Sequence, residues 1–182
     1  WPVYLLETYY ENEDGYKEIN NLIFSKYLEP INIKTYSKQQ RQKYIKDGLI
    51  SQINNIIKKG HNLILVYPVP EMGFSVPKYL LKKIIKKTNK KDDAIPILSE
   101  GYEAYKVRNE LVFEILDSVQ SPNIYRVYPH RVFCDKQIKD RCVANDQNDL
   151  FYFDDNHLSL KGSEFVVEEI MKQIKKMQFK SN

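Results

Sequence analysis

Six residues in the middle of the chain, from Asn62 to Tyr67, most constrain the fold. Leu63 to Val66 are all apolar rather than alternating with polar residues, and Pro68 closes the run. Unbroken apolar runs of this kind are typical of parallel strands covered on both faces, whereas a strand with one solvated face alternates. The sequence therefore predicts a buried parallel strand at residues 62–67. The loop that follows would lie at the carboxyl end of the strand, where open α/β sheets place their ligands.

Helical patterns alternate with strands along the rest of the chain. Ser37 and Gln40 form a capping box, and apolar residues recur at helical spacing from there until Gly60. Further elements are predicted as follows: a helix from Pro77 to about Lys87, a long helix capped by Ser99, a strand at residues 123–128, and a helix from Leu160 to about Met177. This order predicts α/β layering with right-handed crossovers. Roughly thirty residues before the last helix show little regular pattern, which is typical of functional or disordered loops.

Composition limits the class of protein. The 182 residues, 42% of them hydrophobic, suit a single domain with its own core. No apolar run is long enough to span a bilayer, and the amino terminus lacks the pattern of a signal peptide. Because no Met precedes Trp1, we expect a fragment or a processed piece. The net charge is +4, but the lysines are expected to form solvated helix faces, and no nucleic-acid-binding module accompanies them.

The turn upstream of the last helix carries the most evident chemistry. Asp154 lies three residues before His157, and Ser159 is placed to cap the helix. A carboxylate at this spacing can reach Nδ1 of the histidine, fix its tautomer and stabilise the imidazolium during proton transfer. The alternative is an ordinary surface turn, because Asp and Asn commonly form turns. A nucleophile is not evident: Ser75 lies near the carboxyl end of a predicted strand but lacks the sharp strand-to-helix turn that such residues need.

The block from Asp154 through His157 to Gly162 resembles the terminal block of the SGNH hydrolase superfamily, specifically of SGNH domains fused to membrane acyltransferase-3 proteins. Three other stretches are similar to segments of that subgroup, in the same order: residues 1–15, led by Trp1; residues 60–73; and residues 133–142. The resemblance implies a flavodoxin-like three-layer α/β/α sandwich with a parallel sheet, here a single SGNH-like domain over residues 1–182.

The resemblance also implies acyl-ester chemistry. A serine attacks an acyl carbonyl, His157 acts as general base and then general acid, and Asp154 orients the histidine. Asp155 is the next candidate for this partner, and Trp1 is a candidate substrate-binding residue. No metal or organic cofactor is implied. The implied partners are a carbohydrate acceptor and an acyl donor delivered by a membrane acyltransferase domain, with no nucleic acid.

Two cysteines, Cys134 and Cys142, lie eight residues apart in the long predicted loop. A local disulfide would indicate an oxidising compartment, and two free thiols are the alternative. No nearby set of Cys and His completes a zinc site. The resemblance, which includes a paired-cysteine loop, favours the disulfide.

The chain departs from the family at the nucleophile. The family carries it in a Gly-Asp-Ser block on the first strand, and none of the six glycines here is followed by Asp. We expect this block and at least one strand to lie upstream of Trp1, so that these residues alone are inactive; a pseudoenzyme is the alternative.

The expected function is therefore that of the carboxyl-terminal part of an extracytoplasmic SGNH domain. This domain, periplasmic or on the cell surface, would be tethered through a membrane domain and belong to a carbohydrate O-acyltransferase that acetylates a cell-surface polysaccharide, for example a bacterial lipopolysaccharide. One alternative is a carbohydrate acetylesterase, with water as acceptor. The other is an inactive glycan-binding remnant whose aromatic residues stack on sugars, among them Tyr9, Tyr10, Tyr67 and Tyr152.

Overall fold

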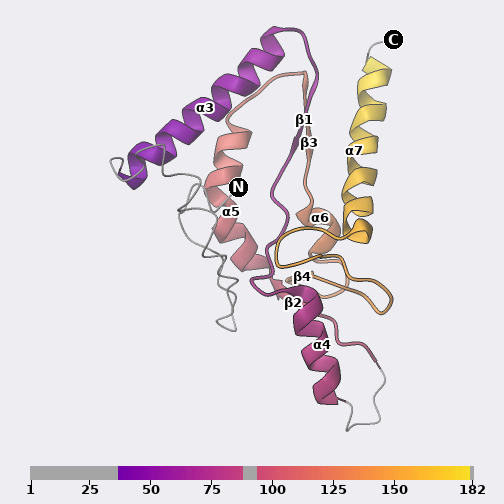
Figure 1. The fold of residues 1–182 in the computed structure, drawn as a ribbon. Coiled ribbons are helices and arrows are strands. Elements are labelled where there is room, and N and C mark those ends of the chain that lie inside the picture. The colour runs from indigo at the N-terminus through magenta and orange to yellow at the C-terminus, as the bar shows by residue number, and fades with distance from the viewer. Residues whose placement is uncertain (1–36, 88–93, 181–182) are drawn as a thin grey trace.

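The computed structural model describes residues 37–87 and 94–180. The predictions for Trp1, Tyr9 and Tyr10 lie outside the described residues. The elements are, in chain order, α3 (Lys38–Lys58), β1 (Leu63–Val66), α4 (Val76–Lys87), β2 (Ser99–Gly101), α5 (Tyr102–Asp117), β3 (Ile124–Val127), α6 (His130–Phe133), β4 (Arg141–Val143) and α7 (Leu160–Lys180) (Figure 1).

The two predicted strands, β1 and β3, are confirmed, and they pair in parallel. Leu63 lies opposite Ile124, and Val66 lies opposite Val127. Parallel neighbours need a long crossover rather than a hairpin, and here α4, β2 and α5 lie between the two strands in sequence.

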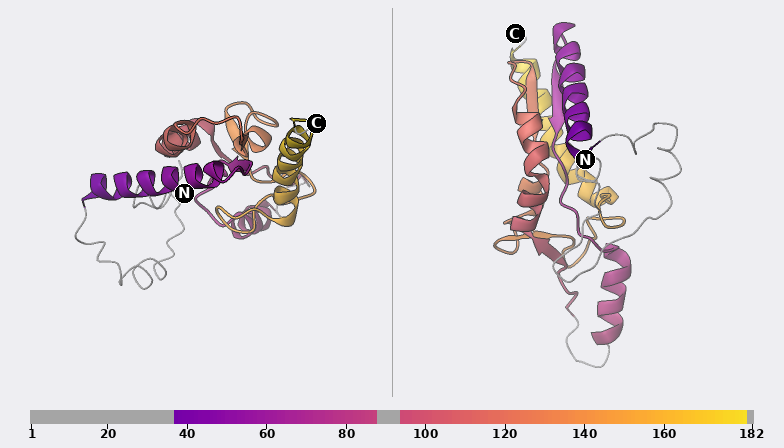
Figure 2. Two further views of the ribbon diagram at one scale, coloured as in Figure 1. Left: turned by 90° about the horizontal axis from the view of Figure 1, so that it is seen from above. Right: turned by 90° about the vertical axis from the view of Figure 1, so that its left-hand side faces the viewer.

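Helices cover both faces of this sheet, with α3 and α5 on one side and α7 on the other (Figures 1 and 2). The side chains of successive residues of β1 point to opposite faces of the sheet, as in any β-strand. Leu63 and Leu65 pack with Ile53 of α3 and with α5, whereas Ile64 packs in a second core that includes Val166 of α7. The α/β sandwich predicted from the sequence is thus confirmed, with a parallel sheet of two strands in the described part of the chain.

A second, antiparallel pair, β2 with β4, was not predicted. The prediction that Ser99 caps a helix is wrong, because Ser99 lies in β2 and α5 begins at Tyr102. The side chain of Arg141 on the facing strand donates to the Ser99 hydroxyl (3.1 Å) and to its carbonyl (2.8 Å), so cross-strand contacts replace the expected cap. The long loop also contains regular structure, α6 and β4, and is more ordered than its sequence indicated.

Candidate functional site

Asp154 and His157 meet in the turn before α7, here named the dyad turn (residues 154–157). Oδ2 of Asp154 lies 2.8 Å from Nδ1 of His157. Oδ1 accepts hydrogen bonds from the backbone amides of Asn156 (3.0 Å) and His157 (2.7 Å). Side-chain-to-backbone bonds of this kind fix an Asx turn, so one carboxylate both shapes the turn and holds the ring. The side chain of His157 is 77% exposed, and that of Asp154 is 29% exposed.

The protonation state of this pair follows from its hydrogen bonds. Partial burial raises the pKa of Asp154, but the amides of Asn156 and His157 and the imidazole outweigh burial and leave this pKa below its ordinary value. The carboxylate is therefore ionised at neutral pH, and an ionised carboxylate only accepts hydrogen bonds. Nδ1 of His157 must then carry the proton, and Nε2 of the neutral ring carries the lone pair. This is the tautomer in which a histidine can take a proton from a nucleophile.

The start of α7 fixes the dyad turn against the body of the domain. The Ser159 hydroxyl accepts from the Gly162 amide (3.1 Å), which confirms the predicted cap, and it donates to the Leu150 carbonyl (2.6 Å). A Cβ on Gly162 would lie 2.1 Å from the carbonyl oxygen of Phe151. Glycine is therefore required for α7 to begin this close to the backbone of Phe151.

The loop after β1, residues 68–75, lies against the dyad turn. The Met72 amide donates to the Asp155 carbonyl (2.7 Å), and the Val76 amide donates to the Asp154 carbonyl (3.1 Å). Since this loop leaves the carboxyl end of β1, the histidine lies at the edge of the sheet where α/β proteins bind ligands.

None of the described residues supplies a nucleophile to His157. Within residues 37–87 and 94–180, no hydroxyl or thiol hydrogen-bonds its ring, whose side-chain contact is Asp154. Ser75 lies at the start of α4, where its carbonyl accepts from the Tyr79 amide (2.9 Å). Among the described residues, no serine therefore contacts the ring of His157 in this structure.

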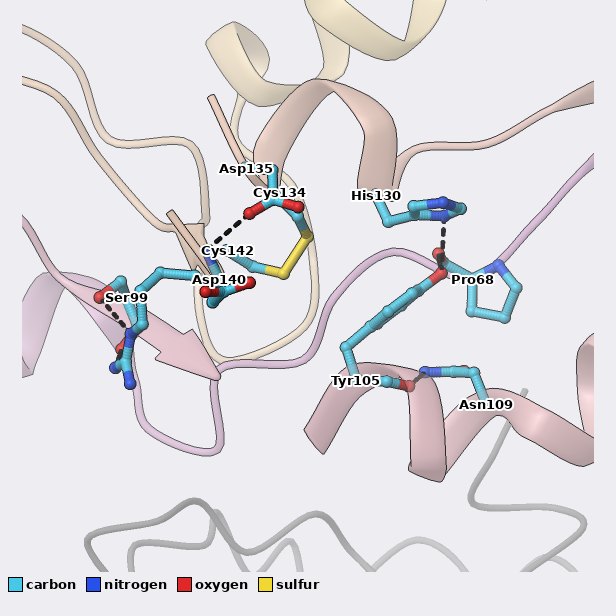
Figure 3. The surroundings of a disulfide bond; sticks show 10 residues. Pro68, Ser99, Tyr105, Asn109, His130, Cys134, Asp135, Asp140 and Cys142 are labelled. Atoms are coloured by element: carbon cyan, nitrogen blue, oxygen red, sulfur yellow. Dashed lines mark hydrogen bonds between the residues drawn. A yellow bond between two sulfur atoms is a disulfide. The ribbon is translucent and has the colours of Figure 1, made fainter. Parts of the chain in front are cut away.

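The cysteine pair forms a disulfide between Cys134 and Cys142 (Figure 3). Both residues are buried, at 3% and 0% exposure, and the alternative of two free thiols is wrong. Between them, the Asp135 side chain accepts from the Asp140 amide (2.6 Å), which closes the loop from α6 to β4. The disulfide thus ties β4 to the segment that follows β3.

A second histidine, His130, was missed by sequence analysis. It follows the carboxyl end of β3, and its Nδ1 lies 3.2 Å from the hydroxyl of Tyr105, which donates to the Pro68 carbonyl (2.8 Å) (Figure 3). Burial, and to a smaller extent the charge of Arg131, lowers the pKa of His130 to about 4. The ring is thus neutral at pH 7. The sequence signal was its position directly after Pro129, where a predicted strand ends.

A pocket of about 420 Å³ opens beside His130. Its lining comes from α5, including Tyr102, Lys106 and Glu110, and from His130, and it does not include His157. The pocket is therefore not part of the site formed by the dyad turn.

Two aromatic residues proposed to stack on sugars are instead part of the cores. Tyr67 is 1% exposed and Tyr152 is fully buried, so that prediction is wrong for both. Tyr67 packs against Phe113 and hydrogen-bonds Asp117, whereas Tyr152 packs against Phe133. Aromatic side chains supply large buried areas, and the two cores use them in that way.

Comparison with protein-family models matches residues 1–172 to the SGNH domain (fused to AT3 domains). The chain belongs to this SGNH family. Searches among curated proteins and among solved structures gave no match. Membership confirms the resemblance and the SGNH hydrolase-like α/β fold, and it supports an acyltransferase or esterase role. The roles of His157 and Asp154, and of Trp1 within the matched range, stay predictions.

The described residues were also searched for membrane-spanning helices and for groups that could bind a metal ion. No helix there has the length and apolar character needed to cross a bilayer. No group of three or more His, Cys, Asp and Glu side chains gathers there in a way that could hold a metal ion.

Proposed function

We propose that this SGNH domain is part of an extracytoplasmic carbohydrate O-acyltransferase that moves an acetyl group to a hydroxyl of a cell-surface polysaccharide. The observation that carries the proposal is the 2.8 Å contact between Asp154 and His157, which fixes the ring tautomer and leaves Nε2 exposed. The fusion of the family to AT3 domains supports a membrane acyltransferase domain as the source of the acyl group.

The chemistry assigned to the dyad turn has two halves. In the first, Nε2 of His157 takes the proton of a serine hydroxyl as the serine oxygen bonds to the acyl carbonyl, and the imidazolium returns that proton to the leaving group of the donor. In the second, Nε2 takes the proton of the sugar hydroxyl as the sugar oxygen attacks the acyl-serine, and the proton returns to the serine. Asp154 stays ionised throughout and stabilises each imidazolium.

One edge of β1 has no partner strand among the described residues, and this supports a serine supplied by a segment outside them. Val66 is 38% exposed, whereas Val127, its partner in the parallel register, is 1% exposed. Among the described strands, β1 pairs with β3 alone. A strand carrying the family's Gly-Asp-Ser block could pair with this edge and end beside the dyad turn.

A carbohydrate acetylesterase is the second candidate, and one observation favours it. The ring of His157 is 77% exposed, so water could reach Nε2 and serve as the acceptor in the second half of the reaction. The two candidates differ in their product. A transferase yields acetylated polysaccharide, and an esterase releases free acetate.

The test uses the full-length protein, with its AT3 domain and nucleophile segment, assayed for acetyl transfer to polysaccharide and for acetate release. We expect His157→Ala to reduce turnover about a thousand-fold or more. His61→Ala is the matched control, because His61 is an exposed histidine at the opposite, amino end of β1. Full activity of His157→Ala would overturn the proposal. Turnover by these 182 residues alone would overturn the proposal that the nucleophilic serine lies outside this chain.

A further inference from the structure

Helix α4 projects away from the rest of the domain (Figures 1 and 2). Its first turns are anchored in the core, where Val76 is fully buried and Leu80 is 8% exposed. Beyond them, three large apolar side chains point into solvent: Leu81 at 58% exposure, Ile84 at 38% and Ile85 at 61%. Because these residues are three and four positions apart, they form one apolar stripe along one side of the helix.

The same helix carries lysines and no acidic residue. Lys78, Lys82, Lys83 and Lys86 are all exposed, and no salt bridge neutralises them within the described residues. Lys78, Lys82 and Lys86 are four apart, so they form a positive stripe beside the apolar one.

Two of the lysines on α7 differ in this respect. Lys161 pairs with Glu164 (2.9 Å), and Lys172 pairs with Glu169 (2.5 Å). Helix α4 is thus rich in lysine without any acidic residue, whereas α7 also carries Glu164, Glu168 and Glu169.

We infer that α4 docks on the surface of an anionic lipid bilayer. An apolar stripe flanked by lysines is the pattern of helices that lie in the interface of a membrane, with the apolar side chains among the lipids and the lysines on phosphates. Leu81, Ile84 and Ile85 would enter the interface, and the four lysines would supply the complementary charge. This inference is independent of the proposed function, because lipid binding needs neither a nucleophile nor an acyl donor.

Docking in this way would also position the dyad turn. The amino end of α4 contacts that turn through the hydrogen bond from Val76 to Asp154, and the helix has 12 residues. At a rise of about 1.5 Å per residue, His157 would lie within about 20 Å of the lipid surface.

The test is co-sedimentation of the 182-residue chain with vesicles of phosphatidylglycerol and phosphatidylcholine in equal parts, and with vesicles of phosphatidylcholine alone. We expect binding to the anionic vesicles and not to the neutral ones, and a steep loss of binding at high salt. Lys82→Glu with Lys86→Glu should weaken binding roughly ten-fold or more, and Leu81→Gln with Ile84→Gln should do the same.

Matched controls carry the same changes on α7: Lys175→Glu with Lys176→Glu, and Val167→Gln with Met171→Gln. All four side chains are exposed, and these variants should bind as the parent does. Thermal unfolding by circular dichroism verifies that each variant is folded. The inference is overturned if the parent does not bind anionic vesicles, or if the α4 and α7 variants lose binding equally. It is also overturned if the α4 changes leave lipid binding intact and instead disrupt association with the AT3 domain in detergent.

Discussion

The amide of Val76 donates a 3.1 Å hydrogen bond to the carbonyl of Asp154, which joins the first residue of α4 to the first residue of the dyad turn. Asp154 therefore has two tasks. Its side chain holds the ring of His157, and its backbone holds the loop that leaves β1. A substitution that changes only the side chain tests its contact with His157 and leaves the backbone hydrogen bond from Val76 in place.

Asp154→Asn is that substitution. The amide oxygen can still accept from the backbone of Asn156 and His157, but its NH₂ group faces Nδ1 and favours the other tautomer of the ring. We expect kcat of the full-length protein to fall about 10³-fold to 10⁴-fold while the fold is retained. Nitrogen NMR shifts of His157 in the 182-residue chain report the tautomer directly. Asp155→Asn is the control and should change neither reading; an unchanged tautomer in Asp154→Asn would contradict the assignment.

Gly162→Ala should destabilise the domain. Its Cβ would lie 2.1 Å from the Phe151 carbonyl oxygen, so the start of α7 would have to move. Overpacking of this kind costs about 1–3 kcal/mol in the free energy of unfolding, measurable by urea denaturation. Gly48→Ala is a matched control within α3, because nothing lies within 4 Å of a Cβ there. Ala is the better helix former, so this variant should gain up to about 1 kcal/mol. Equal effects of the two substitutions would contradict the close contact.

The disulfide should contribute measurably to stability. Replacing Cys134 and Cys142 with Ala removes a cross-link over a sequence separation of 8. The loop-entropy relation gives a loss of about 2–3 kcal/mol in the free energy of unfolding. Thiol titration of the unreduced, denatured protein should detect no free thiol, and two reactive thiols would contradict the pairing.

Acid should destabilise the fold through His130. Its pKa is lowered from 6.5 to about 4 in the folded state, so the unfolded chain binds the proton more readily between these values. Stability is therefore complete above about pH 7 and falls as the pH drops from about 6.5 toward 4, by about 1–2 kcal/mol between pH 7 and pH 5.

His130→Gln is the variant that isolates this effect, because glutamine does not titrate in that range. The variant will be less stable at neutral pH, but its stability should change less between pH 7 and pH 5 than that of the parent. Urea denaturation at both pH values gives the comparison. His61→Gln is the control, since His61 is exposed, and a pH dependence unchanged in His130→Gln would refute the role of burial.

Sequence reasoning succeeded where the determining contacts are local. The apolar run of β1 and the capping box of α3 lie within single segments, and Asp154 reaches His157 across three residues. It failed where the contacts are distant in sequence. The short strands β2 and β4 depend on pairing between residues about forty positions apart and on the neighbouring disulfide, which periodicity cannot reveal.

His130 was missed for the same reason. Its contact with Tyr105, 25 residues earlier, and its burial arise only in the folded chain, and among its sequence neighbours Arg131 adds a smaller effect on the pKa of His130. The two tyrosines assigned to sugar stacking show the converse error. Aromatic side chains suit both sugar stacking and core packing, and Tyr67 and Tyr152 fill the cores on either side of the sheet.

Backbone hydrogen bonds and one close contact join the two ends of the segment from Phe151 to Gly162. The Ser159 amide donates to the Phe151 carbonyl (2.9 Å), the Phe153 amide donates to the His157 carbonyl (2.7 Å), and Gly162 abuts Phe151. An insertion or a deletion within residues 154–157 would change the spacing of Asp154 and His157, and one elsewhere in the segment would disrupt these backbone hydrogen bonds. We therefore expect homologous proteins that keep this pair to keep the length of the segment, with variation in length elsewhere in the chain.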